Sequence, residues 1–199
     1  MEKHARDIGR VCSDAGADRA AFVGVSIGGY ILFEFWRRFR ERVAALAFCD
    51  TRAQADSDEA RANRLRSIEE VQQRGPDAFL DSMLLRLVGS TTRSNRPDRA
   101  AAARAMMAQM TVAGIVAVQQ GMAARPDSVT TLRTITAPTL IIVGDEDVVS
   151  SVPDAELMRQ HIAQSRLEVI PQAGHYAPFE QPEAVTRPLR QFLDAQRWA

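Results

Sequence analysis

The sequence predicts an α/β protein in which a parallel sheet of about four strands is flanked by helices. Near both ends of the chain, short apolar runs typical of buried strands alternate with longer segments of helical periodicity. The middle of the chain, residues 51–128, shows helical patterns and no strand pattern. With 199 residues, 46% of them hydrophobic, the chain is long enough to bury a sizeable core.

The first 50 residues predict the order helix, strand, helix, strand. An apolar stripe over residues 1–15 predicts the first helix. Continuous apolar runs at 20–25 and 43–48 predict strands that are covered on both faces. Between them, residues 31–39 have the wide apolar face of a packed helix.

The middle segment is expected to be a helical insertion. Prolines and a polar stretch at 89–96 are expected to separate its helices. The predicted helices cover residues 56–73, 76–88, 97–110 and 112–124. We expect residues 51–128 to form a cap over a pocket, and residues 1–50 and 129–199 to form the core.

Alternation of strands and helices resumes after the insertion. Strands are predicted at 139–143 and 167–170, with a helix that begins at Ser151 between them. A last helix is predicted from near Pro182. Pro188 is expected to kink or delay that helix, because proline removes a backbone donor.

Residues 24–29, Gly-Val-Ser-Ile-Gly-Gly, join the first predicted strand to the next helix. This pattern is typical of a very sharp strand-to-helix turn with Ser26 at its apex, the nucleophile elbow G-x-S-x-G. We expect the turn to require glycine at positions 24 and 28, because a Cβ atom on Gly24 or Gly28 would clash in so tight a turn.

Ser26, Asp147 and His175 each follow a predicted strand, and ligand sites form at this edge of open α/β sheets. Such a set can perform nucleophilic catalysis. His175 would take the proton of the Ser26 hydroxyl, and Asp147 would orient the imidazole. The backbone N–H of Ile27, next to the nucleophile, would stabilise an oxyanion.

Asp50, at the end of the second strand, is the other position from which a carboxylate could reach the histidine. We expect it to cap the segment that follows it. His4 and His161 lie on predicted helices, and we interpret both as surface or packing residues.

Taken together, these motifs resemble the α/β-hydrolase superfamily, in particular its capped esterases and 3-oxoadipate enol-lactonase-like members. The matching pieces are residues 24–29, Gly144-Asp145-Glu146-Asp147 and Gly174-His175, followed by Glu180-Gln181-Pro182-Glu183. The family pattern places the acid three residues after the glycine, which selects Asp147 over Asp145 and Glu146. The resemblance implies a serine hydrolase that cleaves small carboxylic esters or lactones through an acyl-enzyme. Perhydrolase and carbon–carbon bond hydrolase activity remain alternatives on the same triad.

The resemblance covers strands 5–8 of the eight-stranded family sheet. It therefore implies that the first four strands, and a second oxyanion donor, are missing from this chain. Strand 20–25 would then be an open apolar edge. Three explanations remain open: the chain is incomplete or mis-started, a homodimer or second chain covers the edge, or the protein is a naturally shortened form. A shortened form could be a catalytically impaired scaffold or binding protein.

Composition narrows the expected partners and location. Lys+Arg and Asp+Glu are both 25, so neither a nucleic-acid nor an anionic-membrane partner is expected. No signal peptide and no membrane span is recognisable. We expect Cys12 and Cys49 to be buried thiols of a cytoplasmic protein. The dispersed cysteines and histidines predict no metal site, and residues 24–29 lack the spacing of a nucleotide-binding loop, so no cofactor is expected.

Overall fold

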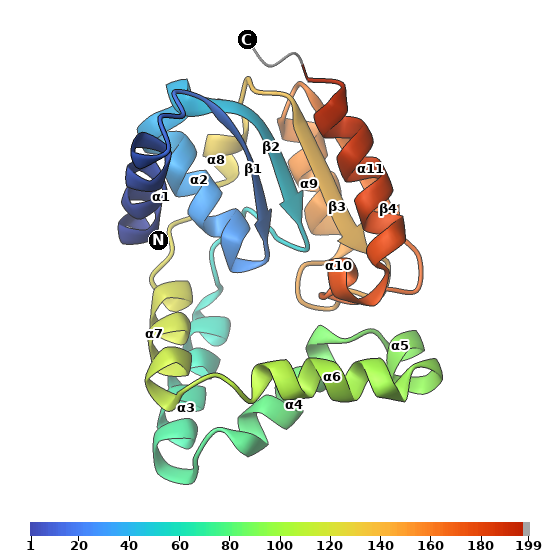
Figure 1. Ribbon diagram of the computed structural model, residues 1–199. Coiled ribbons are helices and arrows are strands. Elements are labelled where there is room, and N and C mark those ends of the chain that lie inside the picture. The colour runs from blue at the N-terminus through green and yellow to red at the C-terminus, as the bar shows by residue number, and fades with distance from the viewer. Residues whose placement is uncertain (197–199) are drawn as a thin grey trace.

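The computed structural model describes residues 1–196, so the last three residues of the expected segment 129–199 lie outside the described part of the chain. A four-stranded sheet lies between helices, and further helices lie across one end of it (Figure 1). All strand pairs are parallel, in the order β1-β2-β3-β4. The strands are β1 (Ala20–Val25), β2 (Val43–Cys49), β3 (Thr139–Gly144) and β4 (Ser165–Ile170). The predicted fold class is confirmed, with strand ends within two residues of expectation.

Helices cover the two faces of the sheet. The helices outside the middle segment are α1 (Glu2–Asp14), α2 (Ile27–Phe39), the 3-10 helix η1 (Arg40–Arg42), α8 (Val129–Leu132), α9 (Val152–His161), α10 (Ala177–Glu180) and α11 (Pro182–Asp194). Helices α2, α8 and α9 pack on one face, and α1 packs on α2. Helix α11 packs on the opposite face.

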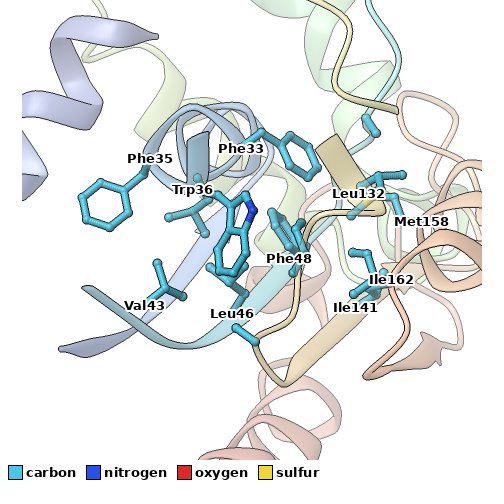
Figure 2. Packing of buried hydrophobic residues seen from close by; sticks show 14 of the residues in the cluster. Phe33, Phe35, Trp36, Val43, Leu46, Phe48, Leu132, Ile141, Met158 and Ile162 are labelled. Carbon is cyan, nitrogen blue, oxygen red and sulfur yellow. The ribbon is translucent and has the colours of Figure 1, made fainter. Parts of the chain in front are cut away.

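The main core lies on the face that α2 and α9 cover (Figure 2). Phe33 of α2 stacks on Phe48 of β2, with ring centroids 4.7 Å apart. Ile141 of β3 and Met158 of α9 complete this layer and are fully buried. Along β2, alternate side chains face the α2 side and the α11 side, which explains why the strand is apolar throughout.

Strand β1 is covered on one face only. Phe22 packs against Phe35 of α2, with ring centroids 4.7 Å apart. Val23 and Val25 point to the other face and are 45% and 40% exposed. Helix α11 contacts β3 and β4 on that face. Within residues 1–196, strand β1 therefore has both an open edge and a partly bare face.

The segment between β2 and β3 is helical, as predicted. It contains α3 (Asp58–Arg74), α4 (Asp77–Leu87), α5 (Ser90–Asn95), α6 (Pro97–Met107) and α7 (Val112–Ala123). These helices lie below the carboxyl ends of the strands in Figure 1. Helices α3, α4, α6 and α7 share a small apolar cluster that includes Val71, Leu80 and Ile115. The polar stretch 89–96 was expected only to separate helices, but it forms the short helix α5. We call the segment 51–128 the insertion.

Helix α11 shows that Pro188 does not delay the helix, so that part of the expectation was wrong. The helix begins at Pro182, as predicted, and continues through Pro188 to Asp194. Pro188 is buried in the same helix as Val185 and Phe192, which pack on the sheet. Packing of this apolar face outweighs the backbone hydrogen bond that proline removes.

No single helix among residues 1–196 is long and apolar enough to cross a membrane. Helices α6 and α7 meet that test only when joined, and the chain bends by 93° between them.

Candidate active site

Ser26 lies at the turn between β1 and α2 in a strained conformation. Its φ and ψ are 51° and −114°, a region that residues other than glycine rarely adopt. Three hydrogen bonds hold the turn. The Ser26 N–H donates to the Cys49 carbonyl at 2.9 Å, and the Ser26 carbonyl accepts from the Gly29 N–H at 2.9 Å and the Thr51 hydroxyl at 2.8 Å. The neighbouring strand end thus fixes the serine.

Side chains are excluded at Gly24, as expected, and at Gly29 in place of the expected Gly28. A Cβ on Gly24 would lie 2.6 Å from the carbonyl carbon of Gly28, so no side chain fits there. A Cβ on Gly29 would collide with the Thr51 side chain. Gly28, two residues after the serine, has open space around its Cα. The expected clash at Gly28 was wrong, because the crowding is at Gly29.

The structure brings Ser26, His175 and Asp147 together in one hydrogen-bonded chain. The Ser26 Oγ lies 2.7 Å from His175 Nε2, and His175 Nδ1 lies 2.8 Å from Asp147 Oδ2. His175 follows β4 and Asp147 follows β3, so both come from the carboxyl edge of the sheet. His175 is 1% exposed and Asp147 is 5% exposed. Such a chain can move a proton from the hydroxyl to the imidazole.

Asp147 is stabilised as a carboxylate. It accepts hydrogen bonds from the Val149 N–H at 2.7 Å, the Ser150 N–H at 3.0 Å and the Ser150 hydroxyl at 2.7 Å. Burial raises the pKa of Asp147, but the bonds and charge of His175 and the bonds from Ser150 outweigh it, so the pKa is lowered overall. Sequence reasoning missed Ser150, which occurs in an ordinary Val-Ser-Ser run at a helix start.

Asp145 and Glu146, the two carboxylates next to Asp147, lie away from His175. Asp145 is exposed, and its carboxylate accepts a hydrogen bond from the Ala173 N–H. Glu146 accepts from the Thr91 N–H and hydroxyl and from the Ser90 hydroxyl, at the start of α5. Only Asp147 of these three reaches the imidazole.

Asp50 neither reaches His175 nor caps the segment that follows it, so the capping expectation was wrong. It is fully buried and accepts from the Gly144 N–H at 3.0 Å and from the Ala177 N–H at 3.1 Å. Burial, followed by the charge of Asp147, raises its pKa well above the ordinary value. Asp50 therefore joins the end of β3 to the start of α10, beside the histidine loop.

Glu180 is a second residue whose role the sequence did not indicate. Its carboxylate accepts from the Gly174 N–H and from the Gly89 N–H, each at 2.9 Å, and the residue is 1% exposed. Gly89 belongs to the insertion, and Gly174 directly precedes His175. Next to this contact, the Tyr176 N–H donates to the Leu87 carbonyl at 3.1 Å. The insertion is thus bonded to the loop that carries the histidine.

The remaining predicted residues lie as follows. Ile27 is the first residue of α2, where N–H groups have no acceptor within the helix. Cys12 and Cys49 are free, buried thiols, as expected. His4 is exposed, and His161 Nδ1 lies 2.9 Å from the Leu157 carbonyl oxygen within α9. Within residues 1–196, no group of three or more His, Cys, Asp or Glu side chains could hold a metal ion.

Comparison with known proteins identifies the family. The family model described as alpha/beta hydrolase fold matches residues 1–182. Two 3-oxoadipate enol-lactonases of Acinetobacter baylyi are similar to the chain. Enol-lactonase 1 is 48% identical over 52 residues, which are 26% of this chain and 19% of that protein. Enol-lactonase 2 is 27% identical over 170 residues, 83% of this chain and 60% of that protein.

This chain spans less than two thirds of either lactonase. Among solved structures, a thermophilic esterase from Thermogutta terrifontis matches it with a TM-score of 0.93 and 40% sequence identity, over 98% of this chain and 72% of the esterase. The family match over most of the chain and the similarity to this esterase agree with the sheet order and the sharp turn at Ser26. The chain belongs to the α/β-hydrolase fold family.

Proposed function

We propose that the protein is a serine hydrolase that cleaves carboxylic esters or lactones through an acyl-enzyme. The observation that carries the proposal is the hydrogen-bonded chain Ser26–His175–Asp147 at a strained strand-to-helix turn. Relatives named esterase and enol-lactonase support this substrate class. No cofactor is part of the proposed reaction.

In the proposed mechanism, the Ser26 Oγ attacks the acyl carbon while His175 Nε2 takes the hydroxyl proton. Collapse of the tetrahedral intermediate breaks the bond to the leaving oxygen, which receives that proton from His175. A water molecule then attacks the acyl-enzyme, again with His175 as base, and releases the acid and Ser26.

Asp147 and Ile27 would support these steps. Asp147 would accept the Nδ1–H of His175 and stabilise the imidazolium that forms. The lowered pKa of Asp147 keeps it ionised for this role. The Ile27 N–H, at the start of α2, would donate to the oxyanion.

We further propose that the insertion, residues 51–128, is a cap, and that residues 1–50 and 129–199 form the catalytic core. The position of the insertion across the carboxyl ends of the strands supports this division. The substrate would then bind between cap and core, and the side chains of the cap would select it.

A second candidate function is that of a binding protein with impaired catalysis. The edge position of β1 favours it, since no strand among residues 1–196 lies beyond β1. The family resemblance implies that the missing strands would also bring the second oxyanion donor. Loss of one oxyanion donor costs about 10²- to 10³-fold in rate in serine hydrolases.

Turnover of 4-nitrophenyl acetate and butyrate tests the proposal. We expect Ser26→Ala to lower kcat by about 10³-fold or more, because the nucleophile is lost. Covalent labelling of Ser26 by a fluorophosphonate separates slow turnover from an inactive serine. Equal turnover by wild type and Ser26→Ala, without labelling of the wild type, would contradict the proposal and favour the binding protein.

A further inference from the structure

The insertion and the loop after β2 contain a concentration of arginine around one acid. Asp56 is buried and forms ion pairs with Arg52, Arg64 and Arg125. These three arginine side chains are 26%, 19% and 3% exposed, respectively. Within residues 1–196, three guanidinium groups share this one carboxylate, so two of their positive charges are not balanced by an acid of the cluster. Charge in such a partly buried place is costly unless it is paired.

Two N–H groups of this cluster have no hydrogen-bond acceptor within the described part of the chain. The Nε atoms of Arg52 and Arg125 are buried and have no hydrogen-bond partner there. Arg125 is otherwise fixed by the carbonyls of Met122 and Gln54, and its guanidinium lies 4.3 Å from the centre of the Tyr30 ring. Arg52 makes one bond, to Asp56.

Arg52 borders a cavity of about 250 Å³. Arg64 of α3 and Arg86 of α4 also line it, while Asp56 is its one carboxylate. Asn63 and Gln119 add polar atoms, and Phe79, Met83 and Val149 form an apolar wall. A basic cavity with a partly apolar wall suits a short carbon chain that ends in an anionic group.

Two residues that line the cavity, Arg52 and Val149, are close neighbours of the proposed catalytic groups. Arg52 directly follows Thr51, whose hydroxyl donates to the carbonyl of Ser26. Val149 lines the cavity and donates its N–H to the carboxylate of Asp147. The cavity thus lies next to the segments that hold Ser26 and Asp147 in place.

We propose that this cavity binds a carboxylate group of the substrate, with Arg52 as the residue that determines specificity. Arg52 would donate to the carboxylate, and Arg64 and Arg86 would add positive charge around it. The inference rests on the proposed function and narrows the substrate class to esters or lactones that carry a free carboxylate.

Two esters of equal acyl length test this specificity. The mono-4-nitrophenyl ester of glutarate ends in a carboxylate, and 4-nitrophenyl pentanoate ends in a methyl group at the same position. We expect wild type to prefer the glutarate ester, and Arg52→Gln to lower the ratio of the two kcat/KM values about tenfold or more. Arg61→Gln is the matched control, because Arg61 lies exposed on the same helix as Arg64.

Arg86→Gln is a second variant for the case that Arg52→Gln fails to fold, since Arg86 is exposed on α4. We expect it to lower the ratio in the same direction. An unchanged ratio in a folded Arg52→Gln protein, or in Arg86→Gln where Arg52→Gln does not fold, overturns the carboxylate site while Ser26-dependent turnover of both esters keeps the proposed function.

A binding measurement keeps the site testable even without turnover. Glutarate and inorganic phosphate are titrated calorimetrically into Ser26→Ala, with and without Arg52→Gln. Glutarate binding that Arg52→Gln weakens about tenfold or more supports the site. Equal binding to both proteins overturns it. Phosphate binding as tight as glutarate would assign the cluster to free inorganic anions instead of a substrate.

Discussion

At the scale of single residues, Asp50 holds an unusual position for a carboxylate. Its two oxygens accept backbone N–H groups from the end of β3 and the start of α10, and no cation pairs with it among the described residues. Burial and the nearby charge of Asp147 raise its pKa, and the charge of Glu180 adds to this. Ionised Asp50 is therefore less favourable in the folded chain than in the unfolded chain.

This gives a prediction for the pH dependence of stability. In the unfolded chain Asp50 has a pKa of about 4. Because its folded pKa is higher, the contribution of Asp50 is largest below that pH and is lost as pH rises toward the folded value. We expect the stability of Asp50→Asn not to fall with pH in this way. The asparagine amide would leave the N–H of Gly144 or Ala177 without an acceptor, which lowers the free energy of unfolding by about 1–3 kcal/mol.

Urea unfolding from about pH 4.5 upward measures the effect. The difference in free energy of unfolding between wild type and Asp50→Asn should shrink as pH rises. Asp127→Asn is the control, because Asp127 is an exposed carboxylate that also accepts two backbone N–H groups. A difference that stays constant with pH would mean that Asp50 has no raised pKa.

Residues of the candidate site differ in how far the sequence could predict them. Ser26, Asp147 and His175 could be predicted because each follows a strand, and because they occur along the chain in the order serine, acid, histidine that is typical of α/β-hydrolases. Ser150 and Glu180 could not, since their importance depends on which backbone groups the fold brings near them. The role of Gly29 was missed for the same reason: it depends on Thr51 from the neighbouring strand end.

At the scale of elements, Glu180 connects the insertion to the histidine loop. Its two oxygens bond to Gly89 and Gly174, whose backbones are too close for a side chain on either residue. Glu146 makes a parallel contact from the loop after β3 to the start of α5. The insertion is thus bonded to the loop of His175 through Glu180 and to the loop of Asp147 through Glu146.

We therefore predict that Glu180→Gln loosens this junction. The amide nitrogen of glutamine would face one of the two N–H donors, so one bond is lost, at about 1–3 kcal/mol of stability. Hydrogen exchange of residues 87–91 and 173–176 should become faster, and ester turnover should fall. Glu183→Gln, an exposed residue on the adjacent helix α11, is the control. Unchanged exchange at both segments would show that Glu180 does not hold the junction.

At the scale of the whole molecule, the sequence predicted the fold well because its strands are short continuous apolar runs and its middle segment is free of them. The exceptions have tertiary causes. Pro188 continues a helix because that helix is packed on the sheet. The stretch 89–96 forms α5 with Glu146 accepting the Thr91 N–H in its first turn. Neither effect is visible in a local pattern.

The uneven cover of the sheet leads to a prediction about association. Strand β1 is an edge strand to which no other strand of residues 1–196 pairs on its outer side, and Val23 and Val25 are partly exposed beside it. Open apolar edges favour pairing with another chain. We expect sedimentation velocity to show species larger than one chain as concentration rises. Val23→Lys/Val25→Lys should reduce these species, because charge opposes edge pairing.

The control variant Val11→Lys/Leu65→Lys adds the same charge at exposed apolar positions on α1 and α3 and should leave association unchanged. Wild type that remains a single chain at all concentrations would show that the edge does not self-associate.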